Sequence, residues 1–313
     1  MIWFIKDILG ITLSLLTYAL LGFADWVAVK FVLLAWFTSA NPRIDWVPLT
    51  DAGLVVCGIY QLILFLSFFS HFQAMTTDPG TITATSAPPT LKNARVCKLC
   101  QCWKPARAHH CKTCNSCIFR MDHHCPWVNN CVGLSNQKLF VLFLCYTALS
   151  AIATLLLFVV GAVCWFRTQQ SWRDAGPPSN LSMICSTMVT VMCLAVVLFV
   201  GDFLQEQIES IQMNSTLVET YQMTHGVRTT FKEHFIAVFG SNWLLWPLPI
   251  QTAPAADYLE PVEVSDPDGY MPPLSRDSDS LGIAGAESES TPDGAQMPEL
   301  RQRHGHIRSG ELD

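Results

Sequence analysis

Charge is scarce in this sequence. Only 14% of its 313 residues are charged and half are hydrophobic, whereas about 25% charged residues is usual in soluble domains. This composition excludes an ordinary soluble enzyme, a disordered chain and a nucleic-acid-binding protein. The charge is also uneven: residues 1–250 carry 15 Lys and Arg against 12 Asp and Glu, and residues 251–313 carry 4 against 13. A weakly basic body followed by an acidic segment is typical of a membrane protein with a solvated tail.

Four apolar runs are long enough for a membrane helix, which needs about 20 residues. They cover residues 8–37, 52–77, 139–166 and 181–201. The last three contain no Lys, Arg, Asp or Glu, and the first contains only Asp25 and Lys30. We expect these two either to face the helix bundle or to lie near an interface of a tilted helix. The sequence therefore predicts an all-α polytopic membrane protein with four transmembrane helices.

Basic residues gather between the second and third apolar runs. This loop contains Lys92, Arg95, Lys98, Lys104, Arg107, Lys112, Arg120 and Lys138. Because Lys and Arg favour the cytosolic side of a membrane protein, we predict that the loop is cytosolic, and four spans then place both termini there too.

The chain divides into five parts by composition. These are the first two spans (1–77), a cysteine-rich loop (78–138), spans three and four (139–201), a juxtamembrane segment (202–250) and an acidic tail of disordered composition (251–313). The juxtamembrane segment has helical spacing around Phe203, Ile208 and Ile211. Its apolar run at 243–247 suits either packing on the cytosolic module or contact with the bilayer surface.

Eight of the thirteen cysteines lie between Cys97 and Cys131, together with four histidines. Cys-x2-Cys pairs mixed with histidine are typical of zinc ligands in a reducing compartment. Twelve such residues exceed one zinc site and suit two, but spacing alone does not choose eight of them. Unligated thiols are the weaker alternative, because so polar a loop lacks the large apolar residues of a core and needs metal to fold.

The tetrapeptide Asp122-His123-His124-Cys125 offers a thiol, an imidazole and a carboxylate within four residues. A thiolate is the reactive form of cysteine, a neighbouring histidine can take its proton, and a carboxylate can orient that histidine. The alternative is that His123 and Cys125 are also metal ligands and that nothing reacts. The residues alone leave both interpretations open.

The run from Asp122 to Trp127, inside a cysteine-rich loop between two spans, resembles the DHHC protein S-acyltransferases. The order of the spans, the Asp-Pro-Gly at 78–80 and the Asn-Asn-Cys-Val-Gly at 129–133 fit the same family over roughly residues 5–250, most closely its Golgi-type zDHHC3/zDHHC7 group. The resemblance implies a palmitoyltransferase of the Golgi or other endomembranes. It would transfer a long-chain acyl group from acyl-CoA, through an acyl-enzyme, to cytosolic cysteines of membrane-associated substrate proteins.

The resemblance also implies a role for each site residue. Two structural zinc ions would be held by two interleaved sets of ligands, Cys97, Cys100, His110 and Cys117 in the first, and Cys111, Cys114, His124 and Cys131 in the second. Cys125 would be the nucleophile, His123 the base and Asp122 the residue that orients it, with Cys102 and His109 outside both sets.

The chain departs from the family at two places. A Thr-Thr-x-Glu motif reads Thr216-Leu217-Val218-Glu219, which puts its packing contact in doubt. His234 stands where many relatives have Asn, which puts in doubt how the juxtamembrane segment docks.

We further expect a cavity among the four spans that takes the acyl chain, because burying sixteen carbons gives on the order of 10 kcal/mol. Lys92, Arg95, Lys104 and Arg107 suit the phosphates of CoA, or else face anionic lipid or water. Trp127 would pack beside the reactive carbonyl or act as a hydrophobic plug. The competing function is a non-catalytic zinc-containing membrane adaptor. A zinc transporter is disfavoured, since His71 is the only histidine in the spans.

Overall fold

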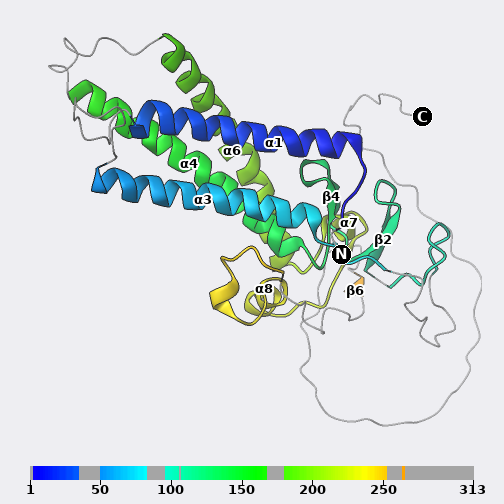
Figure 1. The fold of residues 1–313 in the computed structure, drawn as a ribbon. Helices are drawn as coiled ribbons and strands as arrows, with labels where there is room; N and C mark the ends of the chain where they lie inside the picture. The colour runs from blue at the N-terminus through cyan, green and yellow to red at the C-terminus, as the bar shows by residue number, and fades with distance from the viewer. Residues whose placement is uncertain are drawn as a thin grey trace, which may run out of the picture. The chain divides into compact units, whose positions relative to one another are not determined.

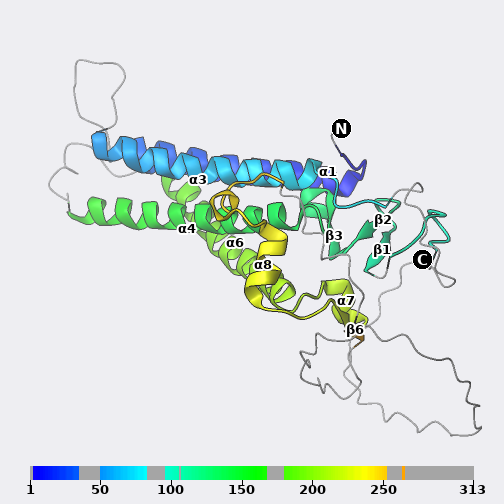
Figure 2. The same ribbon diagram turned by 90° about the horizontal axis from the view of Figure 1, so that it is seen from below.

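Four long apolar helices run side by side in the computed structural model (Figures 1 and 2). They are α1 (Ile8–Ala28, continued by a π-helical turn over Val29–Leu33), α3 (Asp51–Thr76), α4 (Gln137–Arg167) and α6 (Asn180–Gln212). Among the described residues, these four helices are long and apolar enough to cross a membrane, with mean hydropathy between 1.7 and 2.6. The predicted architecture of a four-helix multi-pass membrane protein is confirmed.

The structure describes residues 3–34, 50–82, 96–105, 107–167, 180–251 and 263–264. All of them belong to one unit, Met1–Tyr270. Most of the tail that we predict to be disordered lies outside the described residues, as do Lys92, Arg95 and the end of the first apolar run.

Polar caps explain where two of the helices begin. The Asp7 carboxylate accepts a hydrogen bond from Gly10 N at 2.8 Å, and the Thr50 hydroxyl accepts one from Gly53 N at 3.1 Å. The last helix, α6, is longer than its apolar run. It continues eleven residues past Gly201, where that run ends, and these residues add about 16 Å at 1.5 Å per residue. The extension arises because helical spacing continues after hydrophobicity falls.

The two charged residues of α1 differ in their surroundings. Asp25 accepts a 2.6 Å hydrogen bond from Gln61 Nε2 on α3, so it faces the bundle. Lys30 is exposed, and its ammonium lies 5.9 Å from the centre of the Trp26 ring. The contact of Asp25 agrees with the expectation that it faces the bundle, whereas the place of Lys30 relative to the membrane stays a prediction.

Two short antiparallel hairpins lie within the cysteine-rich loop. In the first, β1 (Ala108–Cys111) pairs with β2 (Ser116–Phe119), and in the second β3 (His123–Cys125) pairs with β4 (Asn130–Val132) through the turn η2 (Pro126–Val128). The all-α prediction did not anticipate them. Two-stranded hairpins are marginal on their own, so the loop depends on other contacts for stability.

Asn130 attaches the second hairpin to the end of α3. Its amide nitrogen is 3.0 Å from Ala74 O and 2.8 Å from Thr77 O, and its amide oxygen accepts from Trp3 Nε1 at 3.0 Å. On the other side Gly10 of α1 lies against Asn129 so closely that a Cβ at Gly10 would collide with it. The hairpin is therefore held at one end of the bundle by both α1 and α3.

The chain after α6 folds back along the bundle. It contains α7 (Leu217–Tyr221), β5 (Thr224–His225), which pairs with β6 (Glu263–Val264), α8 (Phe231–Phe239) and η3 (Trp243–Leu245). His234 docks α8 on the end of α6, because its Nδ1 donates to Gln212 O at 3.1 Å and its Nε2 accepts from Thr229 N at 3.0 Å. Histidine thus supplies both a donor and an acceptor at this position.

The apolar run at 243–247 packs on the protein only in part, and its contact with the bilayer surface stays a prediction. Trp246 packs edge-on against Phe235 of α8, with ring centres 4.9 Å apart, and its indole nitrogen donates to Gly240 O. Trp243 is 68% exposed. One tryptophan therefore packs on the protein and the other faces outward.

Candidate functional site

The first cluster of metal-ligating groups joins Cys97, Cys100, His110 and Cys117, whose donor atoms all lie within 4.8 Å of one another. The three sulfurs are 3.7, 3.2 and 3.9 Å from His110 Nδ1. A tetrahedral zinc with bonds of about 2.3 Å to sulfur and 2.0–2.1 Å to nitrogen separates these atoms by about 3.6 Å. The cluster therefore has the dimensions of a zinc site.

The second cluster joins Cys111, Cys114, His124 and Cys131 in the same way. Their sulfurs lie 3.7, 3.4 and 3.7 Å from His124 Nδ1, and the sulfurs of Cys114 and Cys131 are 3.4 Å apart. Four protein donors close each cluster, as in structural zinc sites. These are the two sets that the family resemblance implies, and Cys102 belongs to neither.

The chemistry of the second donor set also suits a cation. Hydrogen bonds within the sulfur cluster lower the pKa of Cys111 and raise the pKa of Cys131. Three thiolates this close together would repel one another, so a positive charge between them favours their ionisation. A divalent ion supplies that charge and binds all three as thiolates.

Strand alternation explains how two clusters interleave and why one cysteine is spared. Successive side chains of a strand point to opposite faces. In β3 this separates His124 from its neighbours His123 and Cys125, and the residue paired with His124 across the hairpin is Cys131, a member of the same cluster. His123 and Cys125 share the other face, away from the metal ligands.

His123 and Asp122 form a close pair at this face. The Nδ1 of His123 is 2.8 Å from Asp122 Oδ2, while its Nε2 is buried without a well-formed hydrogen bond among the described residues. Burial alone would lower the pKa of His123, but the hydrogen bonds to Asp122 and Cys125 and the charges of these groups outweigh it and raise the pKa to about 10. Because Nδ1 faces Asp122, Nε2 is the nitrogen that can exchange a proton with the Cys125 thiol.

Two further groups fix the Asp122 carboxylate, which is only 2% exposed. Gln207 Nε2 of α6 donates to Oδ2 at 2.8 Å, and the backbone N–H of Leu217 donates to Oδ1 at 2.8 Å. Burial raises the pKa of Asp122, but the hydrogen bonds from His123, Leu217 and Gln207 together with the charge of His123 lower it overall. Asp122 is therefore held as a carboxylate.

Gln207 and the Leu217 amide are site groups that sequence reasoning missed. A signal existed for Gln207, because it lies four residues from Phe203 and from Ile211 and so shares their buried helix face. A backbone N–H has no such signal in the sequence. Because the contact with Asp122 uses the backbone N–H of residue 217, leucine in place of threonine at this position leaves it intact.

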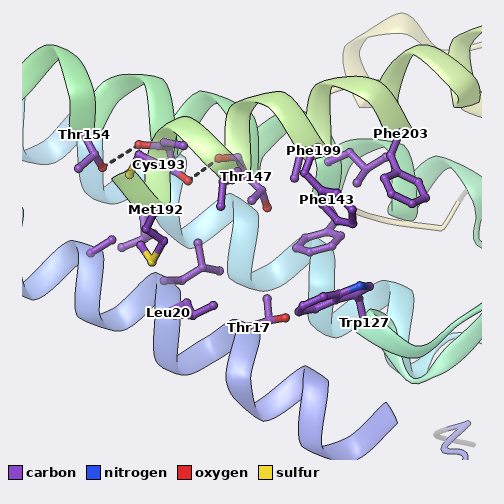
Figure 3. A pocket seen from close by; sticks show the side chains of 18 of the residues that line it. Thr17, Leu20, Trp127, Phe143, Thr147, Thr154, Met192, Cys193, Phe199 and Phe203 are labelled. Atoms are coloured by element: carbon purple, nitrogen blue, oxygen red, sulfur yellow. Dashed lines mark hydrogen bonds between the residues drawn. The ribbon is translucent and has the colours of Figure 1, made fainter. Parts of the chain in front are cut away.

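Cys125 is one of the residues that line a cavity inside the helix bundle (Figure 3). Its volume of about 180 Å³ is more than ten times the 10–15 Å³ that one water requires. Apolar and hydroxyl side chains of all four helices line it, and the indole of Trp127 projects into it beside Phe143 (Figure 3). Thr154 lies at the end of the cavity away from Trp127 (Figure 3), and its hydroxyl is 3.1 Å from that of Tyr60.

Arg107 differs from its expected role. We expected it to face CoA phosphates, lipid or water, but its side chain is 2% exposed and forms a bidentate ion pair with Glu219, at 2.6 and 2.7 Å. The same guanidinium donates to the Asn214 side chain and carbonyl. Glu219 also caps α7 together with Thr216. Although its second residue is leucine, the Thr-Thr-x-Glu motif thus still joins the cysteine-rich loop to the segment after α6.

Comparison with known proteins gives a consistent result. Residues 90–224 match the family model described as DHHC palmitoyltransferase. Palmitoyltransferase ZDHHC3 of Homo sapiens is 34% identical over 265 residues, which cover 80% of this chain and 84% of the relative. Palmitoyltransferase ZDHHC3-A of Danio rerio is 36% identical over 229 residues, 69% of this chain and 68% of the relative. Palmitoyltransferase ZDHHC7 of Rattus norvegicus is 37% identical over 209 residues, 63% of this chain and 62% of the relative.

Proposed function

This chain belongs to the DHHC palmitoyltransferase family and is a protein S-palmitoyltransferase, and we propose that Cys125 is the sulfur on which its acyl-enzyme forms. The observation that carries the proposal is the position of Cys125. It is the cysteine of the loop that belongs to neither metal cluster, lines the bundle cavity and shares a strand face with His123. The alternative of a non-catalytic adaptor is not favoured.

The reaction balances as two thioester exchanges. The Cys125 thiol gives its proton to His123 Nε2, and its sulfur forms a bond to the thioester carbonyl of a long-chain acyl-CoA. The bond from that carbonyl to the CoA sulfur breaks, and the CoA thiolate takes the proton from His123 Nε2. The thiol of a substrate cysteine then gives its proton to His123 Nε2, and its sulfur forms a bond to the acyl-Cys125 carbonyl. The bond from that carbonyl to Cys125 breaks, and the Cys125 thiolate takes the proton back from His123. Asp122 holds the imidazole in position and stabilises its charged form.

The dimensions of the cavity suit a palmitoyl chain. Its lining residues on α4 run from Phe140 to Thr154, a rise of about 21 Å over fourteen steps of 1.5 Å. A fully extended chain advances about 1.2 Å per bond, by analogy with the reach of about 3.6 Å for three backbone bonds, so sixteen carbons span about 18 Å. Burying them gives on the order of 10 kcal/mol.

The metal clusters have a supporting role in this proposal. Cys97, Cys100, His110 and Cys117 would hold one zinc ion, and the second set the other, each with no open position for a substrate. Zinc bound there supplies folding energy to the hairpins rather than chemistry. The hairpins then carry His123 and Cys125 to the end of the bundle.

The location of the site follows from the same proposal. Basic residues of the loop support a cytosolic position for the active site and for both termini. Substrates would be membrane-associated proteins with a cysteine close to the cytosolic surface, in the Golgi or other endomembranes. This compartment is supported by the resemblance to the zDHHC3/zDHHC7 group.

The test is covalent labelling of the full-length protein. Purified protein is mixed with palmitoyl-CoA, and its intact mass is measured before and after hydroxylamine, which cleaves thioesters. We expect one hydroxylamine-sensitive palmitoyl group in the wild type and none in Cys125→Ser. His123→Ala should retain two zinc ions but acylate far more slowly. An acyl group that persists in Cys125→Ser would contradict the proposal, as would unchanged labelling of His123→Ala.

A further inference from the structure

His71 of α3 occupies a position that the reaction scheme does not use. Its side chain is fully buried and touches three other elements. It is hydrogen bonded to Tyr18 of α1 and to the Trp127 carbonyl of η2, and its ring packs edge-on against Phe143 of α4, with ring centres 4.9 Å apart. A single imidazole therefore connects two membrane helices to the turn that follows Cys125.

The direction of each hydrogen bond follows from its partners. The Trp127 carbonyl can only accept, so His71 Nε2, 2.9 Å away, carries a hydrogen and donates. In the neutral imidazole Nδ1 is then an acceptor, and the Tyr18 hydroxyl, 2.8 Å away, donates to it. Tyr18 thereby fixes the tautomer that holds the carbonyl.

The Trp127 carbonyl has a second donor from the membrane helices. The hydroxyl of Ser14 on α1 lies 3.2 Å from the same oxygen. Ser14 is one helical turn from Gly10, which packs against Asn129, and one turn from Tyr18 in the other direction. One stripe of α1 thus contacts the middle of the turn that carries Trp127 and the residue that follows it.

The consequence for the site concerns two groups that share this turn. Cys125 precedes it, and the Trp127 ring projects into the cavity beside Phe143, the same ring that packs on His71 (Figure 3). A shift of the Trp127 peptide would move the sulfur relative to an acyl chain held in the cavity. Displacements of about 1 Å can cost about a hundredfold in rate.

We propose that His71 is a positioning residue: by holding the Trp127 carbonyl, it keeps the Cys125 sulfur in place relative to an acyl chain in the cavity. The inference rests on the proposed acylation of Cys125. It assigns to a membrane helix, rather than to the cysteine-rich loop, the control of where the nucleophile lies.

A matched pair of variants separates the two hydrogen bonds of His71. Glutamine carries its amide nitrogen near the position of Nε2 and can still donate to Trp127 O, whereas asparagine reaches only the position of Nδ1. We expect His71→Asn to acylate Cys125 about tenfold more slowly at saturating palmitoyl-CoA, as for the loss of one buried hydrogen bond, and His71→Gln to stay within about threefold of the wild type. The palmitoyl-CoA concentration for half-maximal rate should change little in either.

Controls exclude a general packing defect. Ser70→Ala alters a neighbouring buried side chain of α3 whose hydroxyl makes no hydrogen bond among the described residues, and it should acylate at the wild-type rate. Zinc content should stay at two in every variant. If His71→Asn loses zinc, Tyr18→Phe serves instead: it should slow acylation in the wild-type background and add nothing in the His71→Gln background.

The outcomes are distinct. Equal rates for His71→Asn and His71→Gln would overturn the positioning role while leaving the proposed function in place. Full additivity of Tyr18→Phe with His71→Gln would overturn it as well. Absence of a Cys125-dependent acyl-enzyme in the wild type would overturn the proposed function and this inference together.

Discussion

Replacing Leu217 with proline removes one N–H donor from the site and little else. Leu217 is the first residue of α7, a position where proline is favoured because its fixed φ suits the helix and no intrahelical N–H is needed. Thr216 before it is extended, with φ −77° and ψ 164°, which a residue before proline accepts. The leucine side chain is 40% exposed, so its loss costs little packing.

The size of the effect follows from the contacts of Asp122. Its carboxylate accepts three hydrogen bonds of 2.8 Å, from His123, Gln207 and Leu217. A hydrogen bond to a charged group contributes about 1.5–3 kcal/mol, and each 1.36 kcal/mol in the barrier is tenfold in rate. If the whole free energy of the lost hydrogen bond were added to the barrier, acylation would slow about 10- to 150-fold. We expect about tenfold, because two of the three bonds remain.

The assay is the single-turnover rate of Cys125 acylation by palmitoyl-CoA, with zinc content measured in parallel. Leu217→Thr is the matched control, since it restores the family's residue and keeps the amide. We expect Leu217→Thr to match the wild type and Leu217→Pro to be slow with both zinc ions retained. Equal rates for the two variants would refute the idea that the amide holds Asp122 in place.

Three other predictions follow from buried contacts. Glu219→Gln leaves Arg107 buried without its counter-charge, which should cost about 3–5 kcal/mol and lower the melting temperature by on the order of 10 °C, whereas Glu209→Gln at an exposed site should change it little. Burial alone would raise the pKa of Glu219, but Arg107 lowers it below 4.5. The difference in melting temperature between wild type and Glu219→Gln should therefore hold above pH 4.5 and shrink as the pH falls below it. Cys117→Ala should release about one zinc ion and destabilise the loop, measured by metal analysis; two retained ions would contradict the ligand set. Ala151→Phe should fill the part of the cavity between residues 151 and 154 of α4, and so shorten the preferred acyl chain by about four carbons. The measurement is competition between acyl-CoAs of different length, and an unchanged preference would show that the chain lies elsewhere.

Several features were predictable from the sequence because they depend on residue type and local spacing. An apolar run of about 20 residues is long enough to cross a membrane whatever its neighbours are, so four spans could be counted directly. Cys-x2-Cys pairs indicate zinc sites because a short turn brings two sulfurs to one ion. The sequence did not predict the hairpins, since strands of three or four residues carry too little periodicity to be recognised.

The sequence by itself determined that this protein has four membrane spans and a cysteine-rich loop with ligands for two metal ions. Tertiary structure decided which groups surround the reactive cysteine. Gln207 and Leu217 reach Asp122 from 85 and 95 residues away, Glu219 removes Arg107 from the surface across 112 residues, and His71 contacts Trp127 across 56. No local pattern encodes these contacts, because each depends on two segments meeting only after the helices pack and the hairpins dock on them.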